Sequence, residues 1–228
     1  MNKISTGNYE FDKWLFGGFE KDIVTVIYGD SGTGKTNFCL LAAVNQAKKG
    51  NKVIYIDTEG GFSLERVKQL SESEYKRVLE NILLLKPANF NEQKEAFKTL
   101  LKNLKNQISL IIVDGMTILY RVELATAKEE RTESLSKINS ELVKQIKTLA
   151  EISRKREIPV IITNQVYRWD EQSKMVGGDI LRYWSKCHIE LINENGKRKA
   201  ILRKHRSLSE KEFDFIIINE GIKRRGWL

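Results

Sequence analysis

The sequence predicts an α/β fold in which a mostly parallel, twisted sheet carries helices on both faces. Short apolar segments rich in β-branched residues alternate with longer segments of helical period as far as about residue 163. A glycine-rich motif stands between the first core strand and the following helix. Nearer the carboxyl end, Asn195-Gly196 separates two strand-like segments and indicates a β-hairpin. We therefore expect an antiparallel C-terminal extension on one edge of the parallel sheet.

The expected elements follow from this alternation. Strands are expected at residues 23–28, 52–57, 82–86, 110–114 and 159–163, and helices at 36–49, 63–79, 91–104 and about 131–156. In the extension, strands are expected at 187–192, 197–204 and 213–218. Because no internal repeat or Pro/Gly-rich linker divides the chain, we expect residues 1–228 to form a single domain.

Composition restricts the class of protein. The 228 residues include 39 Lys and Arg against 30 Asp and Glu, a net charge of +9, which suits a polyanionic partner such as nucleic acid. A basic protein without such a partner stays an equal alternative on composition alone.

The two cysteines, Cys39 and Cys187, are too few for a disulfide framework or a structural metal site. With no segment resembling a signal peptide or a membrane span, we expect a cytoplasmic protein.

The glycine-rich motif has the spacing and the context of a P-loop that binds Mg-ATP. Its backbone N–H groups and the helix N-terminus can surround phosphates. Lys35 can reach the β and γ phosphates, and the Thr36 hydroxyl can bind Mg²⁺. The predicted nucleotide-binding residues are Gly29, Asp30, Ser31, Gly32, Thr33, Gly34, Lys35, Thr36 and Asn37.

Three polar residues at strand ends are candidates for the chemistry. Asp114 ends a buried strand and, as a Walker B acid, can hold Mg²⁺ through water. Glu59 follows residues 52–57 and would lie beside the γ-phosphate if that strand neighbours the P-loop strand, where it can activate water; a helix-capping role is the alternative. Gln165 follows residues 159–163 and can contact the γ-phosphate, although a polar loop residue fits as well.

Together these residues resemble the RecA/RadA recombinase ATPases, above all the short archaeal RadB branch. The resemblance runs in family order across nearly the whole chain. It rests on Ile4-Ser5-Thr6-Gly7, Phe16-Gly17-Gly18, the P-loop, Ile56-Asp57-Thr58-Glu59-Gly60-Gly61-Phe62, Glu65-Arg66, Ile112-Val113-Asp114, Thr163-Asn164-Gln165-Val166 and Gly177-Gly178-Asp179-Ile180-Leu181. It implies a RecA-type P-loop NTPase core.

The resemblance also implies residue roles. Glu59 would be the catalytic carboxylate, Gln165 the γ-phosphate sensor, and Arg66 would stack on the adenine. Two DNA-binding loops would map to residues 120–131 and 166–176. Within them Arg121, Tyr167, Arg168, Trp169 and Lys174 are the expected DNA contacts, because aromatic faces can stack on bases while cations follow the backbone. Packing of Trp169 into the core is an equal alternative.

The chain departs from the full recombinases in ways that limit the expected function. It starts at the ATPase core, so we expect no N-terminal helix-hairpin-helix domain and no Phe-x-x-Ala linker, and the second DNA loop is short. This favours a DNA-binding accessory protein of recombination and repair with weak ATPase activity. Its family partners would be the RadA recombinase and a Holliday-junction resolvase. The alternative is a KaiC-like signalling ATPase without DNA binding.

Lys204 and Arg206 resemble a Lys-x-Arg element that acts on a neighbour's γ-phosphate, which would require a homo-oligomer.

Overall fold

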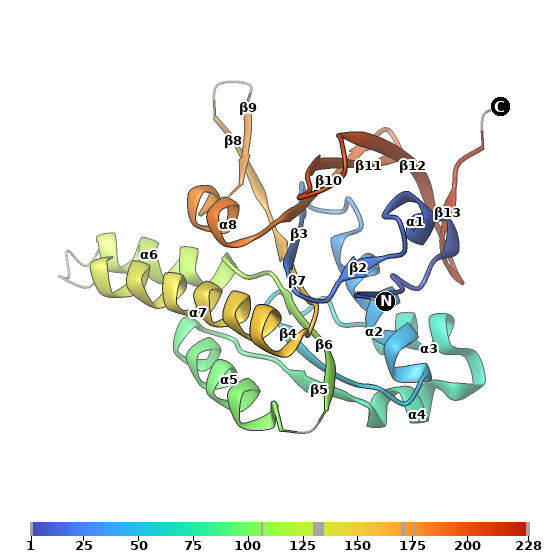
Figure 1. The fold of residues 1–228 in the computed structure, drawn as a ribbon. Coiled ribbons are helices and arrows are strands. Elements are labelled where there is room, and N and C mark those ends of the chain that lie inside the picture. The colour runs from blue at the N-terminus through green and yellow to red at the C-terminus, as the bar shows by residue number, and fades with distance from the viewer. Residues whose placement is uncertain (1, 106, 130–134, 170–171, 176, 227–228) are drawn as a thin grey trace.

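The computed structural model describes residues 2–105, 107–129, 135–169, 172–175 and 177–226, with only the backbone for 167–169 and 172–175. Within these ranges, a nine-stranded sheet has the order β13-β12-β11-β10-β3-β7-β6-β4-β5 (Figure 1). Its strands are β3 (Val24–Gly29), β4 (Lys52–Asp57), β5 (Ile82–Leu85), β6 (Ile108–Asp114), β7 (Val160–Asn164), β10 (Cys187–Glu194), β11 (Lys197–Lys204), β12 (Lys211–Ile218) and β13 (Gly221–Arg224). The first core strand, β3, lies in the middle of this sheet.

Helices cover both faces of the sheet, as predicted. They are α1 (Tyr9–Trp14), α2 (Lys35–Lys48), α3 (Leu64–Ser71), the short 3₁₀-helix η1 (Glu72–Glu74), α4 (Tyr75–Glu80), α5 (Phe90–Asn103), α6 (Ile118–Glu129), α7 (Leu135–Arg156) and α8 (Gly178–Trp184). Within the described ranges, none of them is long and apolar enough to cross a membrane.

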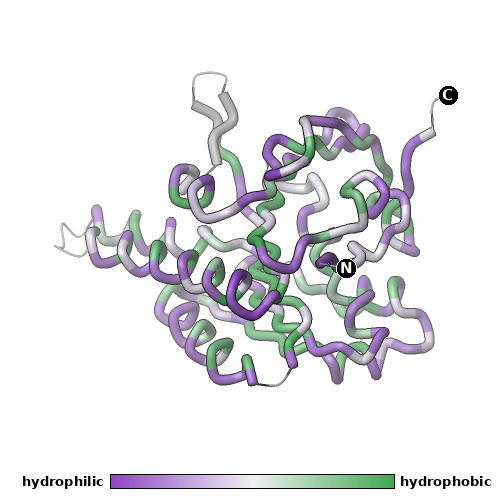
Figure 2. The backbone as a smooth tube through the Cα atoms, in the orientation of Figure 1, coloured by the Kyte–Doolittle hydropathy of each residue, from purple (hydrophilic) through white to green (hydrophobic). Residues whose placement is uncertain are grey.

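Side-chain alternation along the strands builds two hydrophobic cores. In β4, Val53 and Tyr55 join the core beneath α2, whereas Ile54 and Ile56 join the core beneath α5 and α7. Both sets are fully buried because helices cover each face, so the strand is a continuous apolar segment. Figure 2 shows the same arrangement, with the central strands hydrophobic and the outer helix surfaces hydrophilic.

The C-terminal extension lies beside β3, where β10 pairs in parallel and β11, β12 and β13 continue antiparallel. The β10–β11 hairpin turns at Asn195 and Gly196, whose φ angles of 51° and 81° suit a tight turn. Phe215 of β12 packs edge-on against Phe38 of α2, with ring centroids 5.2 Å apart. The extension therefore shares the core of the parallel sheet, and the predicted fold class is confirmed.

Some elements differ from the sequence predictions. The helix expected at 63–79 is divided into α3, η1 and α4, because Glu72 adopts a positive φ of 52° and ends α3. The helix expected from about 131 begins at Leu135 in the described chain, and residues 130–134 lie outside it. Elements absent from the prediction include α1, α6 and β13, the strand β1 (Lys3–Ile4), which pairs with β2 (Phe19–Glu20), and the β8 (Val166–Trp169)–β9 (Gln172–Met175) hairpin.

The core position of Phe215 gives a stability test. We expect Phe215→Ala to lower the free energy of unfolding by about 3–5 kcal/mol, because a fully buried ring leaves a cavity. Ile216→Ala, at the next residue of the same strand but 38% exposed, should cost much less. Chemical denaturation of both variants measures the difference, and equal losses would contradict the described packing.

Candidate active site at the P-loop

The P-loop leads from β3 into α2 and holds Lys35 inside it. Lys35 is buried, and its Nζ donates to the carbonyl oxygens of Gly29 at 2.9 Å and Asp30 at 2.8 Å. Burial lowers the pKa of Lys35, while the negative charges of Glu59 and Asp114 oppose this effect. Both acids therefore act on the ammonium group through their charge. A buried cation under the influence of two acids suits a site that holds phosphates and a divalent ion.

The P-loop packs directly against the C-terminal extension. Gly34 has a φ of +110°, and a Cβ there would lie 3.2 Å from Ile217 Cδ1. A Cβ on Gly29 would lie 2.1 Å from the carbonyl oxygen of Leu191 in β10. Side chains at either position would therefore push the loop away from the extension, which is why glycine is needed there.

Two hydroxyl groups fix the carboxylate of Asp114. Tyr55 Oη donates to Asp114 Oδ2 at 2.8 Å, and Thr163 Oγ1 donates to Asp114 Oδ1 at 2.6 Å. Thr163 Oγ1 also accepts from the N–H of Gly115 at 2.7 Å. Burial, together with the charge of Asp114, raises the pKa of Tyr55 well above its usual value, so the phenol remains a donor. Asp114 therefore points in one fixed direction at the end of β6.

The oxygen atoms of Thr36 and Asp114 converge on one place. A Cβ added to Gly61 would lie 3.2 Å from Thr36 Oγ1 and 3.8 Å from Asp114 Oδ2. No group of three potential metal-ligating side chains occurs in the part of the chain that the structure describes. Mg²⁺ commonly uses one or two protein oxygens together with water and phosphate, so this cradle fits Mg²⁺.

Glu59 reaches this site by a route different from the predicted one. The strand before it, β4, does not neighbour β3, since β7 and β6 lie between them. Glu59 still faces the centre, because Asp57 accepts hydrogen bonds from the N–H groups of Gly61 and Phe62, each at 3.0 Å, and so curls the loop back. Gln165 Nε2 donates to Glu59 Oε2 at 3.2 Å. The two candidate residues therefore meet across the site.

The surroundings of Glu59 change its acidity. Although the residue reaches solvent, partial burial of its carboxylate raises the pKa, and the charge of Asp114 adds to this. Lys35 and the bond from Gln165 act in the opposite direction. A raised pKa brings a carboxylate closer to the range in which it accepts protons effectively at neutral pH.

Arg66 of α3 is held by hydrogen bonds along its guanidinium edge. It donates to Asn37 Oδ1 at 2.8 Å, to Gln69 Oε1 at 2.8 Å, and to the carbonyl oxygens of Asn219 and Gly221 at 3.0 Å each. Stacking on an adenine would use the face of this group, so the predicted role stays a prediction. The bonds do show that Arg66 joins α2 and α3 to the turn between β12 and β13.

The two segments predicted as DNA-binding loops are regular structure in the described chain. Residues 120–129 belong to α6, whose Leu119 and Ala127 pack against Phe90 and Ile138, so the prediction of a loop there is wrong. Residues 166–169 and 172–175 pair as the antiparallel strands β8 and β9 rather than forming an irregular loop. Arg121, on α6, lines a small hollow shared with Glu59 and Gln165. The side chains of Tyr167, Arg168, Trp169 and Lys174 lie outside what the structure describes.

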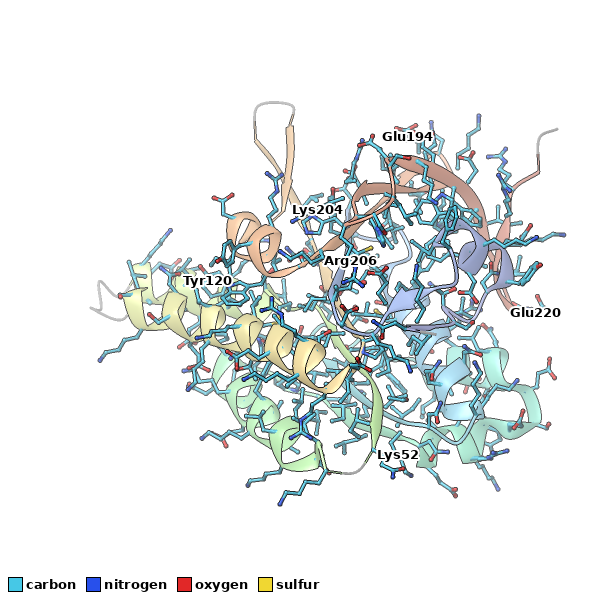
Figure 3. All side chains as sticks on the ribbon, viewed as in Figure 1. Lys52, Tyr120, Glu194, Lys204, Arg206 and Glu220 are labelled. Carbon is cyan, nitrogen blue, oxygen red and sulfur yellow. The ribbon has the colours of Figure 1, made fainter. Side chains whose placement is uncertain are left out.

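Lys204 and Arg206, predicted as trans-acting, make bonds within this chain. Lys204 Nζ donates to the carbonyl oxygens of Arg182 at 2.6 Å and Ser185 at 3.1 Å, beside the end of α8 (Figure 3). Arg206 pairs with both oxygens of Asp22, at 2.7 and 2.8 Å, and with Glu20 at 2.7 Å. A role in trans would require these pairs to break, and it stays a prediction.

Some site residues escaped the sequence analysis. Tyr55 stands in a continuous apolar segment and is indistinguishable there from a core residue. Thr58 joins the end of β4 to β6, because its backbone N–H donates to the carbonyl oxygen of Asp114 at 3.1 Å and its hydroxyl donates to that of Gly115 at 2.6 Å. Thr163 is the next-to-last residue of β7, which pairs with β6, and a hydroxyl side chain after an apolar strand segment was the available signal.

Gly115 offers a test of this packing. Its φ is +92°, and a Cβ would lie 2.4 Å from Thr58 Oγ1 and 2.7 Å from Glu59 Cγ. We expect Gly115→Ala to cost clearly more than the roughly 1 kcal/mol of a positive φ alone. Gly196→Ala is the matched control, with a φ of +81° and no atom within 4 Å of the added carbon. Denaturant unfolding compares them, and equal costs would contradict the contact with Glu59.

Comparisons with known proteins agree with this geometry. The family model described as Rad51 matches residues 1–225. A DNA repair and recombination protein RadB of Methanocaldococcus jannaschii is 43% identical over 209 residues, which cover 92% of this chain and 96% of that protein. The RadB protein of Methanobrevibacter smithii is 40% identical, covering 97% and 95%. A crystal structure of the RadB recombinase aligns with a TM-score of 0.80 at 35% identity, covering 96% of this chain and 97% of that one. The chain therefore belongs to the Rad51 family and is similar to the archaeal RadB proteins.

Proposed function

We propose that this chain is an ATP-binding and DNA-binding accessory protein of homologous recombination and DNA repair, with weak ATPase activity and no strand-exchange activity of its own. The observation that carries the proposal is the convergence of Lys35, Thr36, Asp114 and Glu59 at the carboxyl ends of the parallel strands. Ligands of open α/β sheets bind at that edge. The names of the RadB relatives support repair and recombination as the setting.

The residues have distinct roles in ATP binding and hydrolysis. Lys35 would hold the β and γ phosphates, and Thr36 and Asp114 would hold Mg²⁺, which when bound neutralises phosphate charge. Glu59 would orient water and accept its proton, helped by its raised pKa. Tyr55 and Thr163 would keep Asp114 directed toward the metal through their hydrogen bonds.

Gln165 supplies a connection from the nucleotide to DNA. Its amide bonds to Glu59, and the next residue, Val166, begins the β8–β9 hairpin. If the Gln165 amide left Glu59 and bonded to a phosphate oxygen instead, the start of that hairpin would shift with it. We therefore propose that ATP alters DNA binding through the hairpin. From the resemblance to RadB proteins we also propose the RadA recombinase and a Holliday-junction resolvase as partners.

Binding and turnover of ATP can be separated by two variants. We expect Lys35→Ala to weaken ATP binding at least tenfold, because it removes the cation from the phosphate site. Glu59→Gln should bind ATP nearly as well but hydrolyse it 10²-fold or more slowly, since the amide cannot accept a proton. Calorimetric titration and phosphate release measure the two properties. Unchanged hydrolysis by Glu59→Gln would remove Glu59 from the mechanism.

DNA binding is tested by titrating single-stranded DNA with ATP, ADP or no nucleotide, while measuring particle mass. We expect nucleotide-dependent affinity that falls steeply with added salt, because cations on the protein displace counterions from phosphate. Absence of DNA binding would favour the KaiC-like signalling ATPase. Filament formation with strand exchange by the purified chain would overturn the accessory role.

A further inference from the structure

An aromatic surface with cations lies where the N-terminal segment meets the C-terminal strands. Tyr9 and Phe16 are each 71% exposed. Trp14 and Phe213, with Tyr9, line a hollow of about 410 Å³ between α1 and the end of the sheet. Figure 1 shows α1 beside β12 and β13, on a part of the molecule separate from the β8–β9 hairpin. We call this surface, formed by Tyr9, Lys13, Trp14, Phe16, Lys211 and Arg224, the aromatic–basic surface.

Cations accompany the rings of this surface. Lys13 Nζ lies 4.8 Å from the centre of the Tyr9 ring. Lys211 Nζ lies 5.6 Å from the centre of the Trp14 ring and 4.8 Å from the centre of the Phe16 ring, so one ammonium group lies over both rings. Arg224 also lines the hollow. Glu10 lines it too, and its carboxylate accepts from the backbone N–H of Arg224 at 3.0 Å.

Part of the surface is rigid before any ligand binds. Trp14 stacks on the buried Phe11 with centroids 4.9 Å apart, and its Nε1 donates to the carbonyl oxygen of Glu212 at 3.0 Å. Asn8 Nδ2 donates to the carbonyl oxygen of Ile222 at 2.7 Å and so fixes α1 to β13. A surface held in place by such contacts loses little freedom on binding, which favours affinity.

Phe16 is placed at a cost to stability. Its φ of 55° lies in the left-handed region, which bulky side chains rarely adopt, and its exposed ring gains little from burial. Observed strain of this kind at an exposed aromatic residue points to a functional role.

We propose that the aromatic–basic surface binds single-stranded nucleic acid, with bases stacked on the exposed rings of Tyr9 and Phe16 and phosphates near Lys13, Lys211 and Arg224. Aromatic faces alternating with cations are the combination used by proteins that bind single strands without sequence preference. The net charge of +9 favours a polyanion over a neutral partner. The inference deepens the proposed function by adding a second contact with DNA, distinct from the hairpin.

Phe16→Asn separates binding from folding. Asparagine tolerates a positive φ, so the variant should be at least as stable as the parent protein. We expect its affinity for fluorescent oligo(dT) to fall roughly tenfold, because one stacked base is lost. Leu101→Asn, at a residue of α5 that is 48% exposed, is the matched control and should bind normally. Unchanged affinity of a folded Phe16→Asn protein would overturn the inference and leave a protein as the candidate occupant.

The cations are tested by salt dependence. Lys211→Gln should lower the slope of log affinity against log salt by about 0.7, the share of one phosphate contact in a single strand. Lys98→Gln on α5, which makes the same charge change, should leave the slope unaltered. An equal slope for both variants would contradict the phosphate contact.

Crosslinking distinguishes this surface from the hairpin. Oligo(dT) carrying 5-iododeoxyuridine should crosslink to the tryptic peptides 4–13 and 14–21, which contain Tyr9, Trp14 and Phe16. Crosslinks confined to peptides of the β8–β9 hairpin would overturn this inference and leave the proposed function intact. A complete lack of oligonucleotide binding by the parent protein would overturn both.

Discussion

The parallel register of β4, β6 and β7 determines what the rest of the site can do. Pairing aligns Asp57 with Asp114, and it brings Thr163, at the end of β7, against the same carboxylate. The hydroxyl groups of Tyr55 and Thr163 then satisfy both oxygens of Asp114 in a buried environment. Because unpaired buried carboxylates are costly, these bonds stabilise the sheet as well as orienting the acid. A slip of one residue would turn these side chains to other faces of the sheet.

The periodicity of the sequence predicted the core strands, because they are buried apolar segments. It also predicted most of the helices, because their apolar residues repeat with the helical period. It did not determine strand order, which depends on contacts between distant segments. Glu59 shows the consequence: its strand is not the neighbour of β3, and a loop held by Asp57 carries it to the centre. Tyr55 shows another, since a buried phenol inside an apolar segment looks like core until its partner is known.

Tertiary packing also explains the segments that were predicted as loops. The segment that follows Asp114 has few strong helix signals at its start. Leu119 and Ala127 nevertheless gain burial against Phe90 and Ile138, so α6 is stabilised by its neighbours on α5 and α7. Arg66 is a similar case: as a charge on a helix it carries no signal, yet it bonds to backbone carbonyl groups about 150 residues away.

Strand β12 connects the P-loop with the aromatic–basic surface. Ile217 and Phe215 on this strand lie against Gly34, at the point where the P-loop enters α2. Two residues earlier, Phe213 packs against Trp14 with centroids 5.9 Å apart, and Lys211 lies over Phe16. A displacement of the P-loop would therefore act on a strand that also contacts these rings. The same strand that packs against the P-loop therefore also positions the surface at which we expect a single strand to bind.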